Sequence, residues 1–158
     1  MHALYFVILD QDDAADSRGA RNIATTILIE ENFCYQDGFF GSGKADWFTV
    51  GGRWSGILQL VKLGISVQDF DNLSEEGKTI CWTNNGGDGP YPGSQRRMSG
   101  KDYDDDTMIL TKRFYRKLVT AYPDTEVYDA RVREETRIRD LKLRDVMNQW
   151  LVVIDYHR

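Results

Sequence analysis

The chain begins and ends on short runs of consecutive apolar residues. Residues 3–9 read Ala-Leu-Tyr-Phe-Val-Ile-Leu, and residues 150–154 read Trp-Leu-Val-Val-Ile. Both runs are too short for a typical helix and are rich in β-branched and aromatic side chains, so we expect two strands covered on both faces. Strands of this kind lie in the middle of a sheet. The two runs therefore predict that the first and last strands are central in the fold.

Two segments carry apolar residues at helical spacing. The first helix is expected to begin after Asp16 or Ser17, to continue to Asn32, and to bury Ala20, Ile23, Ala24, Ile27 and Leu28. The second is expected to begin within residues 104–107 and to end before Pro123. Its inward positions would be Met108, Tyr115, Leu118, Val119 and Tyr122.

Further strands are expected at residues 46–54, 79–83 and 125–132, and residues 134–147 favour a short helix. This order of elements predicts a single α+β domain over residues 1–158. The expected fold is a ferredoxin-like plait, a mostly antiparallel sheet with helices on one face, extended by a C-terminal strand. Residues 84–103 are rich in glycine, proline and polar residues, which predicts a mobile loop within this domain.

The composition excludes several classes of protein. The formal net charge is −5, so the basic field of a nucleic-acid-binding protein is absent and no nucleic acid is expected as a partner. Two isolated cysteines, Cys34 and Cys81, indicate reduced thiols rather than a disulfide framework. With no signal peptide and no apolar run long enough to span a bilayer, we expect a cytoplasmic protein without a membrane partner.

The densest group of unusual residues is the segment from Asp46 to Gly56, Asp-Trp-Phe-Thr-Val-Gly-Gly-Arg-Trp-Ser-Gly. Indoles bring large contact area, glycines let another group approach the backbone, and a guanidinium offers a rigid fork for an anion. We therefore predict a ligand-binding site formed by Asp46, Trp47, Gly51, Gly52, Arg53 and Trp54. The alternative is a scaffold strand whose indoles pack inward, whose glycines mark a bulge, and whose Arg53 pairs with a carboxylate such as Asp46.

Other chemical patterns are incomplete. Residues 38–45 satisfy the glycine and lysine spacing of a phosphate loop, but Ala45 replaces the hydroxyl that would hold magnesium and a strand-like segment follows. His2 and His157 would meet near Asp155 if the first and last strands pair antiparallel, yet a third firm metal ligand is missing. Since no nucleophilic triad is evident either, no catalytic residue, metal or cofactor is assigned.

The segment from Asp46 to Gly56, with Ala20-Arg21 upstream and Asp155-Tyr156-His157 near the end, resembles a loosely defined set of uncharacterised bacterial and phage proteins. The resemblance covers about a third of the chain and implies no activity.

Because aromatic and arginine groups are concentrated while acid–base partners are not, we expect a non-enzymatic module that binds a small anionic ligand or a protein partner. Two alternatives remain. One is an enzyme acting on a nucleotide or phosphoester, with Arg53 stabilising charge and Asp155 or His157 transferring protons. The other is a phage-type inhibitor that blocks a host protein through an acidic surface.

Overall fold

The computed structural model describes residues 1–34, 43–84 and 106–158, and its centre is an open mixed sheet of six strands. The predicted loop over residues 84–103 therefore lies, apart from Asn84, outside the described residues. The strands are β1 (His2–Leu9), β2 (Trp47–Val50), β3 (Thr107–Ile109), β4 (Glu126–Asp129), β5 (Glu134–Arg137) and β6 (Trp150–His157). The helices are α1 (Ser17–Glu30), α2 (Ile57–Leu63), α3 (Val67–Asp71), α4 (Glu75–Asn84), α5 (Lys112–Ala121) and α6 (Leu143–Val146). Three short 3-10 turns complete the described chain: η1 (Gln11–Asp13), η2 (Gly52–Trp54) and η5 (Ile138–Asp140).

The first and last strands lie at the centre of the sheet, as their apolar runs predict. The strand order is β2-β6-β1-β4-β5, and β3 pairs with β6 as well. β1 and β6 are antiparallel over their whole length, from His2 opposite His157 to Leu9 opposite Trp150. β1 and β4 are parallel, whereas β4 and β5 form an antiparallel pair. The expectation of an α+β fold is confirmed, but the sheet is mixed and the ferredoxin-like plait is not confirmed.

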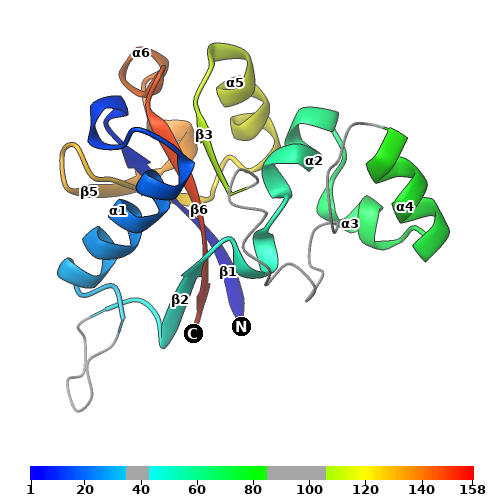
Figure 1. Cartoon of the computed structure of the whole chain (residues 1–158), viewed down its shortest axis with the longest axis horizontal. Helices are drawn as coiled ribbons and strands as arrows, with labels where there is room; N and C mark the ends of the chain where they lie inside the picture. Colours follow the sequence, from blue (N-terminus) through cyan, green and yellow to red (C-terminus); the bar gives the residue numbers. More distant parts are fainter. Residues whose placement is uncertain (35–42, 85–105) are drawn as a thin grey trace.

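Helices cover both faces of the sheet, so the expectation of helices on one face is wrong (Figure 1). On one face α1 packs through Ala20, Ala24 and Leu28. On the other face α2 and α5 pack against alternate residues of β1 and β6, among them Phe6 and Val153. The physical reason lies in the strands themselves, because a strand that is apolar on both faces needs a layer of cover on each. α3 and α4 lie beyond α2, where Phe70 and Trp82 pack together.

β2 and β3 occupy successive positions along one edge of β6. The Gly51 N–H donates to the Val153 carbonyl, and the Val153 N–H donates to the Asp106 carbonyl, both at 2.8 Å. The chain therefore leaves the sheet at Gly51 and returns at Asp106, beside the same residue of β6. α2, α3 and α4 belong to this excursion.

Several local predictions were wrong because pairing and packing outweighed local pattern. Residues 79–83 belong to helix α4, whose start is capped by the Ser74 hydroxyl accepting from the Gly77 N–H, whereas a strand was expected. Residues 107–109 pair with β6 instead of opening a helix, so α5 begins only at Lys112, after the Thr111 cap. A short apolar run cannot by itself separate strand from helix.

Boundaries elsewhere changed more modestly. The strand expected over residues 46–54 ends at Val50, because the chain turns at Gly51 into η2. The strand expected over residues 125–132 is the shorter β4. Residues 134–147 hold β5, η5 and the short helix α6 rather than one helix.

Candidate functional site

The two glycines of the predicted site stand where the chain turns out of β2. Gly51 and Gly52 have φ values of +73° and +54°, which favour glycine. A Cβ at Gly51 would lie 2.3 Å from an Asp106 carboxylate oxygen, and one at Gly52 would lie 2.6 Å from an Asp155 carboxylate oxygen. The groups that approach these glycines are therefore two carboxylates of the protein itself, which gives both glycines a structural role.

Asp155 is the buried anchor of this turn, with only 1% of its surface exposed. Its Oδ2 accepts the Arg53 backbone N–H at 2.8 Å, and its Oδ1 lies 2.9 Å from His2 Nδ1. A buried carboxylate requires partners of this kind because the ionised group loses its hydration. The contact orients the imidazole, since a His2 Nδ1 that donates to Asp155 leaves Nε2 as the acceptor.

The two histidines of the described chain meet in space. Their ring centroids are 5.3 Å apart, because His2 and His157 are opposite each other in the β1–β6 register. The Trp47 indole stacks on His157 with an interplanar angle of 1°, and His157 Nδ1 lies 3.3 Å from the Asp46 carboxylate. We name His2, Asp46, Trp47, Asp155 and His157 the two-histidine cluster. Within the described residues, no group of three His, Cys, Asp or Glu side chains is arranged to hold a metal ion.

Arg53 and Trp54 point to different environments. The Arg53 side chain is exposed, and no ion pair to its guanidinium occurs within the described residues. Asp46 contacts His157 instead, so the structure shows no ion pair between Arg53 and Asp46. Trp54 packs partly buried against the core on the α2 and α5 side of the sheet.

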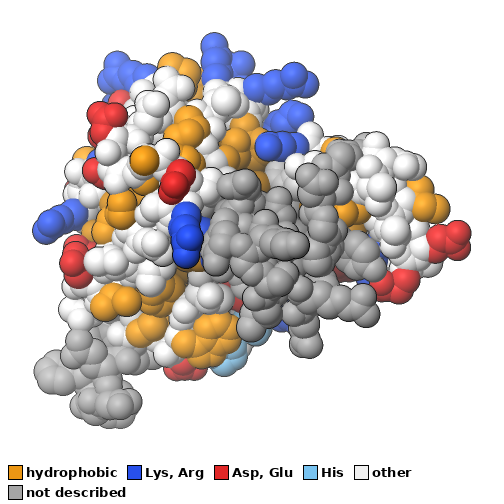
Figure 2. All heavy atoms as spheres, in the orientation of Figure 1, with side chains coloured by type: hydrophobic (Ala, Val, Ile, Leu, Met, Phe, Trp, Pro, Cys, Tyr) orange, Lys and Arg blue, Asp and Glu red, His pale blue; other side chains and the backbone are white. Residues whose placement is uncertain are grey.

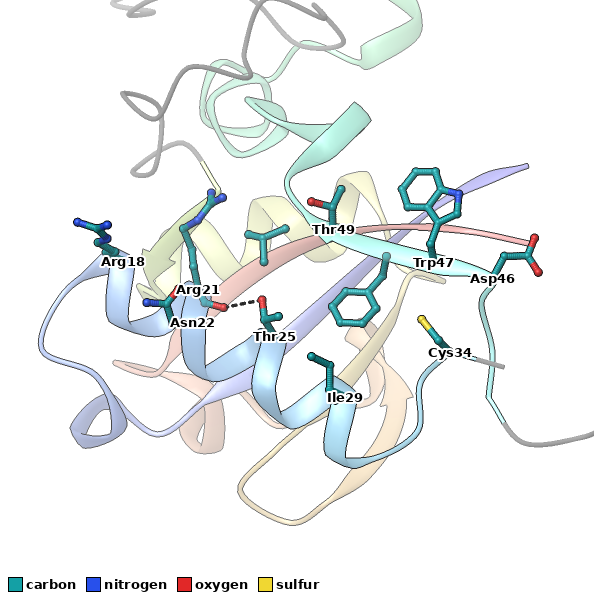
Figure 3. Close-up of a pocket in the computed structure, with 11 residues that line it drawn as sticks. Arg18, Arg21, Asn22, Thr25, Ile29, Cys34, Asp46, Trp47 and Thr49 are labelled. Carbon is teal, nitrogen blue, oxygen red and sulfur yellow. Dashed lines mark hydrogen bonds between the residues drawn. The ribbon is translucent and has the colours of Figure 1, made fainter. Parts of the chain in front are cut away.

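A groove of about 500 Å³ lies between β2 and α1 (Figure 3). We name it the α1–β2 groove. Its lining residues come from one stripe of α1, from the end of the following turn, and from β2: Arg18, Arg21, Asn22, Thr25, Ile29, Cys34, Asp46, Trp47, Phe48, Thr49 and Val50. Of the six residues predicted for a site, only Asp46 and Trp47 line it. They also belong to the two-histidine cluster, so the two features share one rim.

Charge within the α1–β2 groove is unevenly placed. The Arg21 guanidinium binds the buried Asp106 carboxylate at 2.8 Å, which ties α1 to the start of β3. At the other end, burial and the nearby Asp46 carboxylate raise the pKa of the Cys34 thiol. The negative charge of a thiolate is therefore disfavoured at that end of the groove.

The lysine of the phosphate-loop pattern is already paired. Lys44 contacts the Glu126 carboxylate and lies 2.6 Å from Glu135, and the chain continues from it into β2 rather than into a helix. Residues 38–42 lie outside the described residues. The described residues of the pattern, 43–45, therefore form a connector that leads into β2.

Sequence reasoning missed the contribution of α1. The groove residues of α1 follow one another mostly at intervals of three and four, which places them on one face of the helix. They are Arg18, Arg21, Asn22, Thr25 and Ile29. The apolar spacing that predicts this helix carries no information about the polar stripe beside it. An arginine pair on the outer face of an amphipathic helix was the available signal.

No family model matches the chain, and comparison with curated proteins and with solved structures gives no match either. No helix in the described part of the chain is long and apolar enough to cross a membrane.

Proposed function

We propose that this protein is a non-enzymatic binding module and that its α1–β2 groove holds part of a protein partner. The observation that carries the proposal is that the groove lining includes two exposed large apolar residues, Ile29 on α1 and Trp47 on β2, whose indole points away from α1 (Figure 3). Trp47 of β2 is 42% exposed, and Ile29 of α1 is 63% exposed. Hydrophobic side chains reach the surface over α1 and β2 (Figure 2).

Exposed apolar groups that border one groove favour protein recognition. An aromatic anchor with an aliphatic neighbour supplies most of the binding free energy in many interfaces, and arginines at the border add orientation. The α1–β2 groove combines these features, with Arg18 on the same helix stripe as Ile29. A small anion would use the arginines alone and leave the apolar wall in water, so a protein partner fits the whole lining better.

The test compares two charge insertions at exposed isoleucines. Ile29→Glu places a carboxylate on the groove wall, while Ile80→Glu places one on α4, where Ile80 is 51% exposed and outside the groove. In intact-complex mass spectrometry after gentle purification, the parent and Ile80→Glu should retain a partner that Ile29→Glu loses by about tenfold or more. Equal retention by all three proteins would refute the groove as the site. A retained mass of a few hundred daltons would reassign the groove to a small ligand.

One observation favours a second candidate, an enzyme acting on a phosphoester. His2 and His157 lie side by side and each contacts a carboxylate, Asp155 and Asp46 respectively. Two adjacent imidazoles suit general acid–base catalysis, in which one takes the proton of an attacking water and the other gives a proton to the leaving oxygen. Arg53 would then stabilise the developing negative charge.

Turnover of bis(p-nitrophenyl) phosphate tests this candidate directly. If the two-histidine cluster is catalytic, His2→Gln and His157→Gln should each reduce turnover by about a hundredfold or more while the protein stays folded. A parent protein without turnover, both with and without added divalent metal, would remove the enzyme from consideration.

A further inference from the structure

Positively charged side chains gather over α5 and α2 (Figure 2). The two helices are neighbours, since the Lys117 ammonium group donates to the Lys62 carbonyl at 3.0 Å. No aspartate or glutamate occurs in residues 51–68 or 107–123, which contain both helices. We give the name α2–α5 basic surface to the cations of these helices, which are Lys62, Lys112, Arg113, Arg116 and Lys117.

The charges of the α2–α5 basic surface are not paired. Within residues 1–34, 43–84 and 106–158, none of its five side chains forms an ion pair with a carboxylate. The hydrogen bond of Lys117 is to a neutral carbonyl, so its charge remains. Exposed cations on β5 and α6 behave differently, since Arg137 and Arg144 each lie 3.6 Å from a carboxylate. The basic surface therefore presents positive charge that these parts of the chain do not neutralise.

This arrangement of charge opposes the stability of α5. Lys112 and Arg113 lie in its first turn, where positive charge is unfavourable beside the helix dipole. Lys112 and Arg116 are four residues apart, as are Arg113 and Lys117, and like charges at this spacing destabilise a helix. The fold therefore does not account for the basic surface, whereas an anionic partner would relieve the repulsion.

The outward face of α5 offers charge without an apolar anchor. At about 100° per residue, its four cations span an arc of about 140°. Thr120 is the remaining residue within that arc. The large apolar side chains of the helix, Phe114, Tyr115 and Leu118, are buried against the core on the opposite side. A partner of this face must therefore bind through charge.

That composition separates the possible anionic partners. A protein interface gains most of its binding free energy from aromatic or aliphatic anchors, and stable attachment to a membrane needs an inserted apolar group or a lipid chain besides charge. Single-stranded nucleic acid is held by exposed aromatic rings on which its bases stack. The phosphate backbone of a duplex, by contrast, binds through neutralisation of its charge and release of counterions.

We propose that the α2–α5 basic surface binds the phosphate backbone of a nucleic-acid duplex, independently of base sequence. This inference goes beyond the proposed function, because the surface shares no residue with the α1–β2 groove. The absence of a nucleic-acid partner was expected from a net charge of −5, a sum that hides the local concentration of one sign. Acidic residues more than about 10 Å away are largely screened at about 0.1 M salt, so they oppose binding weakly.

Binding of a fluorescein-labelled DNA duplex of about 20 base pairs, followed by anisotropy, tests the proposal. At about 50 mM salt the parent should bind with a Kd in the micromolar range. If four or five phosphates are contacted, the logarithm of the binding constant should fall with the logarithm of salt concentration at a slope of about −3.6 to −4.5. A duplex of unrelated sequence and an RNA duplex should bind within about threefold, because phosphate contacts carry no base information.

Two double variants with the same change of net charge locate the site. Arg113→Gln with Arg116→Gln removes two exposed, unpaired cations of the basic surface. Arg137→Gln with Arg144→Gln removes two exposed cations that already contact carboxylates. The first pair should lower affinity by about tenfold or more and reduce the salt slope by about 2, while the second changes affinity by less than about threefold. Circular dichroism checks that both remain folded.

Several results would overturn the proposal. They are absence of duplex binding by the parent at about 50 mM salt, equal losses in the two double variants, and tighter binding to a single strand of the same length. Tighter binding to vesicles of phosphatidylcholine and phosphatidylserine would reassign the basic surface to a membrane. Ile29→Glu, which alters the α1–β2 groove, should bind the duplex within about twofold of the parent, so the two proposals stand or fall separately.

Discussion

The backbone N–H of Arg53 donates to the buried carboxylate of Asp155 at 2.8 Å, which joins the exit turn of β2 to the last strand. The bond uses the peptide and leaves the guanidinium exposed. The Arg53 peptide therefore serves the fold, while its guanidinium has no ion pair within the described residues.

Gly52→Ala should destabilise the protein far more than Gly64→Ala. Both glycines have positive φ, at +54° and +71°, so either alanine carries a backbone cost of about 1–2 kcal/mol. At Gly64 nothing lies within 4 Å of the added Cβ, whereas at Gly52 the methyl group meets Asp155 at 2.6 Å. The clash should add about 1–3 kcal/mol. Urea denaturation of the two variants measures the difference in their free energy of unfolding. Equal losses in the two variants would show that Asp155 shifts to make room for the methyl group without a measurable loss of stability.

Replacing Arg53 should leave stability nearly unchanged. Arg53→Ala and Arg53→Lys should both unfold within about 1 kcal/mol of the parent, because the guanidinium is exposed and the bond to Asp155 comes from the peptide. Denaturation by urea provides the measurement. A loss of about 3–5 kcal/mol in Arg53→Ala that Asp46→Asn relieves would contradict the geometry and restore a structural ion pair.

The His2–Asp155 contact should show strong energetic coupling. Asp155 is only 1% exposed, so its contact with His2 lies in a site with little water. Removing either partner leaves the other without its contact there, and His2→Gln and Asp155→Asn should each lower the free energy of unfolding by about 3 kcal/mol. The double variant should cost less than the sum by about 1–3 kcal/mol. The exposed Asp46–His157 contact supplies a matched control, with an expected coupling below about 1 kcal/mol. Similar coupling in the two cycles would show that burial does not decide the strength of these contacts.

Alkaline pH should destabilise the fold through Tyr5. Burial, followed by the hydrogen bond to Glu135, raises the pKa of the Tyr5 phenol in the folded protein. The stabilisation of the neutral phenol is complete below the unfolded-state pKa of about 10 and is lost as pH rises above it, because only the unfolded chain releases the proton. Each pH unit above about 10 should cost about 1.4 kcal/mol for this group. Tyr5→Phe should reduce the slope of stability against pH by that amount, as measured by denaturation between about pH 9 and pH 11. An unchanged slope would refute the assignment to Tyr5.

Much of the scaffold could be predicted because its signals are local and strong. The apolar runs of β1 and β6 indicated central strands, and the spacing of Ala20, Ala24 and Leu28 indicated α1. Residues 79–83 and 107–109 could not be assigned locally, because a few apolar residues form a helix or a strand according to what they meet. Residues 79–83 form part of a helix whose Trp82 packs against Phe70 of α3. Residues 107–109 form a strand because they pair with β6.

The amino-acid pattern alone predicted an α+β protein with buried end strands and a candidate site in the segment that contains Trp47, Gly51, Gly52 and Arg53. Those conclusions depend on hydrophobicity, spacing and the conformational freedom of glycine, which are properties of nearby residues. Three relationships emerge from the three-dimensional fold instead: the glycines make room for Asp106 and Asp155, His2 meets His157, and α1 and β2 enclose a groove. Each of these relationships joins residues far apart in the chain, and their distance is set by sheet register and helix packing rather than by local pattern.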